Sequence, residues 1–434
     1  MSTITRNVTK YQYENFEFAS PDLFLAADFQ QSGLYSIKHE DGVYTDVLFW
    51  NQHSDVTIVC FNGAGFPSDN IRPGFNGTSM FRSWRDENRA NFIFIHDATL
   101  YLDSSLGLAW YGGSRDFAYQ DLLELLIRKF VAVNLPNHLI FFGISGGGHT
   151  ALNYAARFPG SIAVAGNPQT NVDKYLDWAK NKYYRTCWSK RDEPGAIDNS
   201  GFLHDMVSVY AQAPQNFAYC LVNANDRHHI EDHLIPLIEA AHNTLNVRTL
   251  LRHWGKGHTA CPPGFLLEFF GELIDRRRAG DVFPDVFGAR LLESRDDVEA
   301  VLHHQVSPLR VALFRGELAT AAPLSFDLPS FANGTVELTA KAQSESDKAV
   351  SIAVEFVSDQ PSVDQYVYSL RTSARGYQVS MLLRPGNFSV LRTYLPMDFK
   401  ATAIRFIPSP KETVRITSVE LVAYSHEQKE KKDQ

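Results

Sequence analysis

The chain has 434 residues, 44% of them hydrophobic, and a formal net charge of -8. This length predicts two or three domains, and the hydrophobic share is ample for their buried cores. Both charge signs are evenly mixed and no basic stripe stands out, which argues against nucleic acid or an anionic membrane surface as the main partner.

The N-terminal sequence MSTITRNVTK lacks the continuous apolar core of a secretory signal. No later apolar run approaches the roughly 18 residues that are needed to span a bilayer. Cys60 and Cys220 lie inside apolar strand-like runs, and none of the four cysteines has the spacing of a metal site. We therefore expect a cytoplasmic protein without a membrane span.

Residues 56–275 alternate short β-branched or aromatic runs with longer helical patterns, which predicts a parallel sheet with flanking helices. The expected strands are 56–61, 91–95, 138–142, 161–165, 217–222 and 247–251. The expected helices are 119–130, 150–157, 230–242 and one that begins near residue 264. We assign residues 1–45 to an N-terminal extension and residues 46–280 to an α/β domain.

The sequence Gly143-Ile144-Ser145-Gly146-Gly147 matches the G-x-S-x-G nucleophile elbow, a sharp strand-to-helix turn that exposes a serine above the sheet. It follows the expected strand 138–142 and precedes the expected helix 150–157, which is the context that the motif requires. Glycines relieve steric crowding at this turn, and the serine backbone is held under strain. The alternative is a glycine-rich turn with an idle serine.

A serine nucleophile needs a base, and the base needs an orienting acid. Asp226 follows the expected strand 217–222 and is the candidate acid. His258 follows the expected strand 247–251 in a loop with glycines and is the candidate base. The alternatives are His253 or His149 as the base, and Asp232 or Asp205 as the acid.

An oxyanion hole requires two backbone N–H groups. The expected donors are Gly146, which follows the serine, and Ala64, on the loop after the expected strand 56–61; Gly63 is the alternative to Ala64. An ordinary strand-to-helix turn remains the other interpretation of this loop.

His229 and His233 would share one helical face and could form a metal site. A helix start with acidic and imidazole groups in its first turns is the commoner meaning of such a cluster, so we predict no metal. The mixed-charge region 187–202 interrupts the alternation and is expected to be an insertion over the site.

The pattern changes to two-residue alternation near residue 311, for example at Val350, Ile352, Val354 and Phe356. Turn sequences separate these runs, such as Asn333-Gly334 and Pro385-Gly386-Asn387. We therefore predict a linker over 281–310, an all-β sandwich over 311–425 and a charged tail over 426–434.

The elbow and its candidate partners resemble those of the α/β-hydrolase superfamily, over about residues 46–280. The resemblance implies an α/β-hydrolase fold, followed here by the β-sandwich. It also implies Ser145 as nucleophile, Asp226 as acid, His258 as base and the loop 62–65 as the oxyanion element.

The segment 161–175, SIAVAGNPQTNVDKY, resembles the segment after the sixth strand in bacterial capsule polysaccharide O-acetyltransferases of this fold. In that family a serine accepts an acetyl group and passes it to a sugar hydroxyl. The resemblance implies that Asn167 and Gln169 line the site. The appended β domain and His149 depart from the pattern, so the acceptor glycan does not carry over. A loop that merely ties down the next helix is the alternative.

Three further residues complete the set of candidate substrate-binding residues: Asn62, His149 and Trp110. Trp110 could stack on a sugar ring, although aromatic residues of this kind more often pack in a core or rim.

Three functions follow from these residues. The first is O-acetylation of a bacterial polysaccharide through an acyl-enzyme, with acetyl-CoA as a candidate donor and no bound cofactor. The second is a carbohydrate or carboxyl esterase, which uses the same chemistry with water as the acceptor. The third is a non-catalytic glycan-binding or scaffold protein. The substrate would be a carbohydrate or a small ester, and a homo-oligomer is left open.

Overall fold

The computed structural model describes residues 4–425 except 40–41, 66–70, 191–192, 194, 304–308, 321–322, 329–333, 345–349, 359–370, 374–375, 384–387, 396–400 and 408–413. The predicted tail 426–434 and the turns at Asn333 and at 385–387 lie outside these residues. The chain divides into two compact units. The first comprises Met1–Val222, Asp226–Leu251 and Phe270–Val298, and the second comprises Asn223–Asn225, Arg252–Phe269 and Glu299–Gln434.

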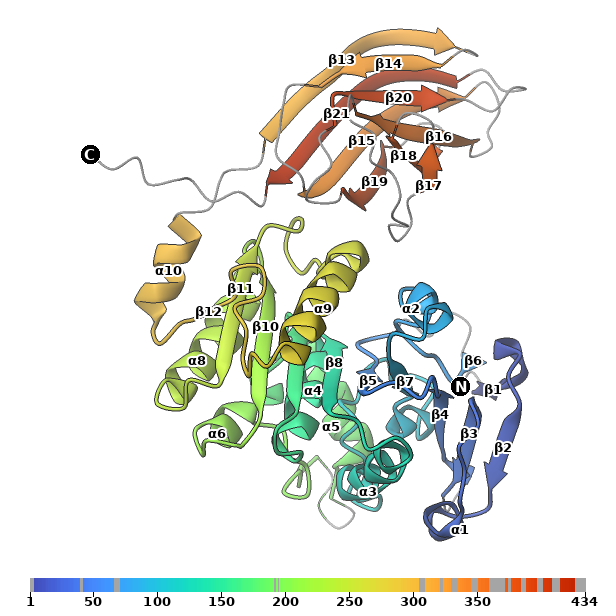
Figure 1. Ribbon diagram of the computed structural model, residues 1–434, viewed down its shortest axis with the longest axis vertical. Coiled ribbons are helices and arrows are strands. Elements are labelled where there is room, and N and C mark those ends of the chain that lie inside the picture. Colours follow the sequence, from blue (N-terminus) through green and yellow to red (C-terminus); the bar gives the residue numbers. More distant parts are fainter. Residues whose placement is uncertain are drawn as a thin grey trace. The chain divides into compact units, whose positions relative to one another are not determined.

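The α/β part is built on a ten-stranded sheet with the order β12-β11-β10-β9-β8-β5-β7-β4-β3-β2 (Figure 1). Its strands are β2 (Asn15–Phe18), β3 (Gly33–Lys38), β4 (Tyr44–Trp50), β5 (Val56–Phe61), β7 (Asn91–Ile95), β8 (His138–Ile144), β9 (Ile162–Gly166), β10 (Phe217–Asn223), β11 (Val247–Arg252) and β12 (Arg290–Leu291). The short strands β1 (Thr5–Arg6) and β6 (Ile71–Arg72) pair separately.

The centre of the sheet is parallel. Strand β5 pairs in parallel with β7 and β8, β8 with β9, and β9 with β10. Strand β4 runs antiparallel to both β3 and β7, and β12 runs antiparallel to β11. The central strands are buried along nearly their whole length, which explains their continuous apolar runs.

Helices lie on both faces of the sheet. Successive residues of a strand point to opposite faces, and both faces of the central strands carry apolar side chains that the helices cover. Phe141 of β8 contacts Phe158 after α4, with ring centroids 5.1 Å apart, whereas the next residue, Phe142, contacts Phe270 of α9 at 5.2 Å. The helices are α1 (Pro21–Ala26), α2 (Arg82–Asp86), α3 (Tyr119–Ala132), α4 (Gly146–Ala156), α5 (Asp177–Cys187), α6 (Met206–Tyr210), α7 (Arg227–His229), α8 (Ile235–Ala241), α9 (Pro263–Arg278) and α10 (Arg295–His303), with a π-helix at Ile230–Leu234 and 3-10 turns at Thr9–Tyr11, Ala98–Tyr101 and Val172–Lys174.

These elements form the predicted mostly parallel sheet with flanking helices, an α/β-hydrolase-like fold. All six expected strands are present within two residues of their predicted bounds. Residues 1–45, predicted as an extension, supply β2 and β3 to the same sheet. The predicted helix 230–242 begins as a π-helix and continues as α8. The predicted linker 281–310 contains β12 and α10.

The C-terminal part contains two antiparallel sheets, with the orders β13-β21-β15-β19 and β14-β20-β16-β18-β17. Their strands are β13 (Leu309–Thr320), β14 (Leu324–Asp327), β15 (Gly334–Ser344), β16 (Val350–Val357), β17 (Arg371–Ser373), β18 (Gly376–Leu383), β19 (Phe388–Tyr394), β20 (Ala403–Ile407) and β21 (Val414–Ser425).

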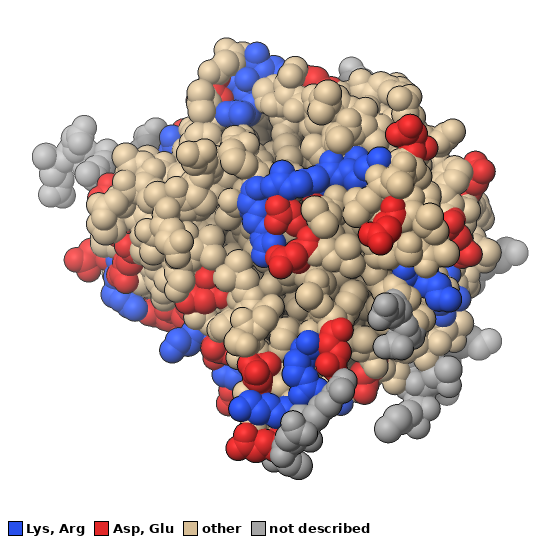
Figure 2. All heavy atoms as spheres, turned by 90° about the horizontal axis from the view of Figure 1, so that it is seen from below, with Lys and Arg blue, Asp and Glu red and all other residues tan. Residues whose placement is uncertain are grey.

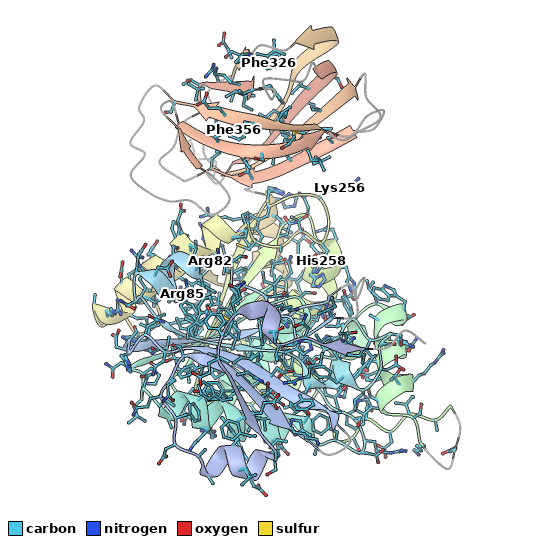
Figure 3. All side chains as sticks on the ribbon, turned by 90° about the vertical axis from the view of Figure 1, so that its right-hand side faces the viewer. Arg82, Arg85, Lys256, His258, Phe326 and Phe356 are labelled. Atoms are coloured by element: carbon cyan, nitrogen blue, oxygen red, sulfur yellow. The ribbon has the colours of Figure 1, made fainter. Side chains whose placement is uncertain are left out.

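The two C-terminal sheets share one hydrophobic core, as the predicted sandwich requires. Leu338 and Leu421 from the first sheet cluster with Ile352 and Phe356 from the second. Figure 3 shows Phe356 among these strands and Phe326, which packs edge-on against Phe406, at their upper edge.

Lys and Arg side chains lie among Asp and Glu side chains on the face drawn in Figure 2. Within the described part of the chain, no helix combines the length and the hydrophobicity that crossing a bilayer demands.

Candidate active site

Ser145 occupies a sharp, strained turn between β8 and α4. Its backbone has φ 59° and ψ -119°, a conformation that costs an L-residue on the order of 1–3 kcal/mol. Neighbouring strands fix the turn, because the Ser145 N–H donates to the Gly166 carbonyl of β9 at 2.7 Å. Ser145 is 8% exposed. This is the geometry that a nucleophile elbow predicts.

The glycines around Ser145 are required by sterics. A Cβ on Gly143 would lie 2.1 Å from the Gly147 carbonyl oxygen, and a Cβ on Gly147 would lie 2.7 Å from the Phe61 carbonyl oxygen. A Cβ on Gly146 would lie 2.4 Å from the Leu108 side chain. Helix α4 therefore sits so close to β5 and β8 that side chains cannot be accommodated at Gly143 and Gly147, whereas a side chain at Gly146 would require Leu108 to move.

Gln169 is the side chain that fixes the Ser145 hydroxyl. Gln169 Nε2 donates to Ser145 Oγ at 2.8 Å, and Trp110 Nε1 donates to Gln169 Oε1. The indole therefore decides which end of the amide faces the serine. His149 Nδ1–H donates to the Gln169 carbonyl at 2.8 Å, which anchors the backbone of the same residue. Gln169, His149 and Trp110 are all buried.

Tyr175 adds a hydroxyl beside the same serine. Burial raises the pKa of Tyr175, and side-chain hydrogen bonds with Ser145 and Gln169 act in the opposite direction. Its ring lies 6.1 Å from that of Trp110, nearly perpendicular to it. The hydroxyl of Tyr175 thus stays protonated at neutral pH and can donate a hydrogen bond in the site.

The predicted oxyanion donors lie beside the elbow. Gly146 is the first residue of α4, so its N–H has no acceptor within the helix. The loop after β5 passes close by, since a Cβ on Gly63 would lie 2.7 Å from the Ile144 carbonyl oxygen. The N–H groups of Gly63 and Ala64 have no hydrogen-bond acceptor among the described residues, whereas the Gly65 N–H donates to the Gly107 carbonyl.

Residues 107–111, which include the candidate Trp110, hold this loop, a role that the sequence did not predict for them. Tyr111 is buried, and its hydroxyl accepts the Asn62 N–H at 2.7 Å and donates to the Ile95 carbonyl at 2.7 Å. The buried carboxylate of Asp97 accepts the Tyr111 N–H at 2.8 Å. Because all these contacts are long-range in sequence, no local pattern could have revealed them.

The candidate acid Asp226 follows β10, caps α7 and is 4% exposed. Its Oδ1 accepts the His229 N–H at 3.3 Å, and its Oδ2 lies 2.9 Å from His229 Nδ1. The helix start and the imidazole both favour a charged carboxylate in a fixed orientation.

Three imidazoles gather beside Asp226. The ring centroids of His228, His229 and His233 lie 5.1–5.3 Å apart. His228 Nδ1 is 2.9 Å from Asp232, the alternative acid, at an exposed position. Burial lowers the pKa of His233 to about 2, so its imidazole is neutral. Asp226 and His229 place an oxygen and a nitrogen side by side, and both are atom types that can bind a metal. The expected absence of a metal therefore stays a prediction.

His258 lies in the second unit, exposed, on the loop after β11 (Figure 3). Within that unit Asn223 Nδ2 donates to the carbonyls of Gly255 and Gly257, and Asn225 Nδ2 donates to that of Gly255. Gly255 and Gly257 have φ of 151° and 61°, values that favour glycine. Burial lowers the pKa of His253, the alternative base on this loop.

Two other candidate substrate-binding residues have structural partners. The Asn62 amide donates to the Gly74 carbonyl and accepts the Asn76 N–H. Asn167 is fully buried, and its N–H donates to the Leu221 carbonyl of β10. Asp205, the other alternative acid, caps α6 through Val207 and Ser208. The substrate-binding roles of Asn62, Asn167, His149 and Trp110 stay predictions.

No family model matches the chain. None of the curated proteins matches it either. Among solved structures, it is similar to the capsule O-acetyltransferase of Neisseria meningitidis serogroup A, with 15% identity and a TM-score of 0.40 over 59% of this chain and 96% of that chain. Another structure of that enzyme holds CoA.

Two further structures are similar over comparable lengths. The esterase Pf2001 of Pyrococcus furiosus has 12% identity and a TM-score of 0.36, over 62% of this chain and 96% of that chain. The Gap123 complex of Streptococcus agalactiae has 18% identity and a TM-score of 0.39, over 59% of this chain and 47% of that chain.

Proposed function

We propose that the chain is a serine acyltransferase that forms an acyl-enzyme on Ser145 and passes the acyl group to a hydroxyl of a bacterial polysaccharide. The observation that carries this proposal is the Ser145 turn. A strained serine between a strand and a helix, with a polar side chain on its Oγ and nearby N–H groups that have no acceptor among the described residues, is costly to build and has a clear chemical use.

In the first step, Ser145 Oγ attacks the carbonyl carbon of an ester or thioester while its proton passes to His258. Asp226 stabilises the resulting imidazolium, and the N–H groups of Gly146 and Ala64 bind the oxyanion. The tetrahedral intermediate then expels the alcohol or thiol, which takes the proton from His258. Gln169 occupies an acceptor position on Oγ, so the hydroxyl proton is left to point toward the base.

His258 is proposed as the base because of how its loop is held. The residues that tie down Gly255 and Gly257, Asn223 and Asn225, come immediately before Asp226 in the chain. His229 is 2% exposed in a helix, with one ring nitrogen already against Asp226. We assign His229 to positioning the acid.

In the second step a hydroxyl attacks the acyl carbon and its proton passes to His258. The bond between the acyl carbon and Ser145 Oγ then breaks, and His258 returns the proton to Oγ. The resemblance of residues 161–175 to capsule polysaccharide O-acetyltransferases supports a sugar hydroxyl as the acceptor and acetyl-CoA as the donor. From the sequence, we also expect the protein to be cytoplasmic, and we leave a homo-oligomer open. Water in place of sugar would make the enzyme an esterase.

The test compares wild type with Ser145→Ala on acetyl-CoA, with and without bacterial polysaccharides, following acetate on sugar and free acetate. Polysaccharide-dependent transfer by wild type alone supports the proposal. Equal acetate release with and without polysaccharide identifies an esterase, and no turnover of acetyl-CoA or simple esters contradicts both. His258→Gln should lose as much activity as Ser145→Ala; a larger loss in His229→Gln would move the base to His229.

A further inference from the structure

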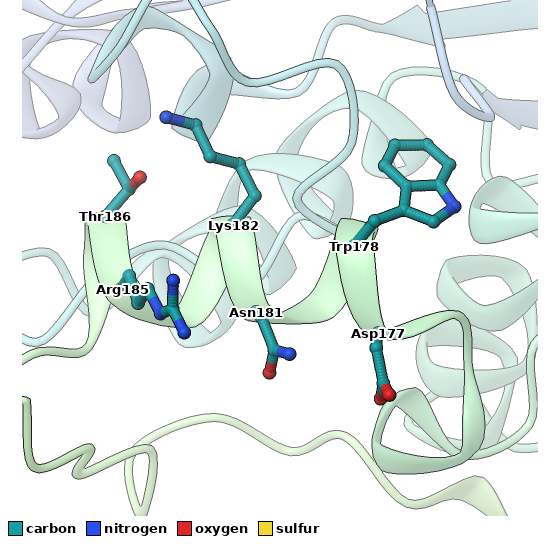
Figure 4. A pocket seen from close by; sticks show the side chains of 6 residues that line it. All are labelled: Asp177, Trp178, Asn181, Lys182, Arg185 and Thr186. Atoms are coloured by element: carbon teal, nitrogen blue, oxygen red, sulfur yellow. The ribbon is translucent and has the colours of Figure 1, made fainter.

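The outer face of α5 forms a hollow with a volume of about 580 Å³, which we call the α5 hollow (Figure 4). It is lined by Asp177, Trp178, Asn181, Lys182, Arg185 and Thr186. Residues three or four positions apart are neighbours on a helix surface. Figure 4 shows Trp178 and Lys182 projecting from one edge of α5 and Asp177 and Asn181 from the other, so the hollow spans a broad outer face of the helix.

Trp178 presents an uncovered ring in this hollow. It is 70% exposed, whereas an indole with a partner buries on the order of 150–250 Å² of its surface. The other side of α5 is well packed, since Ala179, Tyr183 and Cys187 lie in a hydrophobic cluster. The exposure of Trp178 therefore does not reflect a poorly packed helix, and the ring offers a flat surface to a ligand.

Two cations follow the ring along the same face. Lys182 and Arg185 stand four and seven residues after Trp178, and no carboxylate among the described residues forms an ion pair with either. The carboxylate of the hollow, Asp177, is already 2.9 Å from Lys180. The hollow thus places two positive charges beside an aromatic ring, a combination that favours an anionic ligand, although Lys182 also acts on the carboxylate of Asp103, whose pKa it helps to lower.

Helix α5, which carries the hollow, also contacts residues around the nucleophile Ser145. Helix α5 begins two residues after Tyr175, whose side chain hydrogen bonds with Ser145. On its inner side, the ring of Tyr183 lies 5.5 Å from that of Trp110, which holds Gln169. A ligand on the outer face of α5 is therefore bound to an element whose inner face carries contacts of the active site.

We propose that the α5 hollow is a subsite for an acidic oligosaccharide, the acceptor of the acyl transfer. A sugar ring would stack on Trp178, its carboxylate or phosphate would pair with Lys182 and Arg185, and its hydroxyls would bond with Asn181 and Thr186. The inference rests on the proposed function and adds the chemical class of the acceptor. The Asp177 carboxylate suits sugar hydroxyls and disfavours a polyphosphate.

The test measures binding by full-length Ser145→Ala, so that no turnover occurs. Two acidic probes, hexagalacturonate and mannopentaose phosphate, are compared with neutral maltohexaose by calorimetry and by quenching of tryptophan fluorescence. At least one acidic probe should bind more tightly than maltohexaose. The added changes Trp178→Ala and Lys182→Ala/Arg185→Ala should each raise its Kd about tenfold or more. Lys174→Ala, an exposed lysine outside the hollow, is the matched control.

Two outcomes would overturn the subsite. These are no preference for either acidic probe over maltohexaose, or binding of the acidic probes that the hollow variants leave unchanged. Cleavage of a small acetyl ester by the same variants with Ser145 intact separates the two proposals. If Ser145 hydrolyses the ester while the hollow does not bind saccharide, the proposed chemistry stands and the subsite is wrong. If the hollow binds saccharide but neither the wild type nor any variant with Ser145 intact cleaves esters, the proposed acyl transfer is wrong, and only the saccharide binding stands.

Discussion

Gln169 Nε2 donates a 2.8 Å hydrogen bond to Ser145 Oγ, and the two residues follow the neighbouring parallel strands β9 and β8. Because parallel strands end at the same edge of a sheet, a residue 24 positions away reaches the nucleophile. The amide has one orientation, since Trp110 donates to its oxygen. This pair makes Gln169 a positioning residue for the serine.

Removing the amide should slow turnover without unfolding the protein. Gln169→Ala is expected to lower kcat on a small ester by roughly 10- to 100-fold, with KM less affected, because the hydroxyl loses its orientation. Trp110→Phe keeps a ring but frees the amide to rotate, so it should give a smaller loss. Trp50→Phe is the control, as this buried indole N–H has no acceptor among the described residues. Equal kinetics in all three variants would contradict a positioning role.

The Tyr111 hydroxyl should matter for both stability and activity. Tyr111→Phe removes the partner of the part-buried Asn62 N–H and of the buried Ile95 carbonyl, which should cost about 1–3 kcal/mol of unfolding free energy. It should also lower kcat by loosening the loop that bears Ala64. Tyr154→Phe removes another buried hydroxyl, which donates to the Gln120 carbonyl, and should lower stability alone. Urea denaturation and ester kinetics on both variants decide whether the two effects separate.

The elbow glycines should not tolerate a methyl group. Gly143→Ala would place Cβ 2.1 Å from backbone, and we expect a loss of about 3 kcal/mol or more in unfolding free energy, or no folded protein. Gly271→Ala, inside α9 with nothing within 4 Å, should instead be neutral or stabilising by up to about 1 kcal/mol. A stable, active Gly143→Ala would show that the turn is looser than described.

Buried histidines should make the protein sensitive to acid. Burial lowers the pKa of His39, His96 and His149 to about 4 and that of His233 to about 2. Below pH 6.5 the unfolded chain therefore binds more protons than the folded chain, so stability falls on acidification by up to about 1.4 kcal/mol per pH unit for each histidine. Asp97, whose pKa burial raises to about 6, acts in the opposite direction between pH 4 and 6.

The variant His233→Leu tests this pH dependence. Neither ring nitrogen of His233 has a hydrogen-bond partner among the described residues, so the change removes a titrating group at little other cost. Unfolding free energies at pH 7.5 and 5.5 should differ less in the variant than in wild type. An unchanged difference would mean that His233 does not titrate as described.

The sequence predicted well those elements whose conformation depends on residues that are close together in the chain. Apolar runs predicted the central strands because both faces of a parallel sheet are buried, and Gly143-Ile144-Ser145 predicted the elbow because its crowding is local. The antiparallel strand β4 was not predicted as a strand, because Thr45 and Asp46 interrupt its apolar pattern and confine the apolar run to residues 47–50. The roles of Tyr111, Asp97 and Tyr175 depend on contacts between distant segments, which one sequence does not display.

The nucleophilic character of Ser145 is tested most directly by incubating the full-length protein with a fluorophosphonate probe and mapping the adduct by mass spectrometry. We predict one adduct on the peptide that contains Gly143-Ile144-Ser145-Gly146-Gly147, and none on folded Ser145→Ala. A folded wild-type protein that stays unlabelled, or an adduct on another serine, would contradict it.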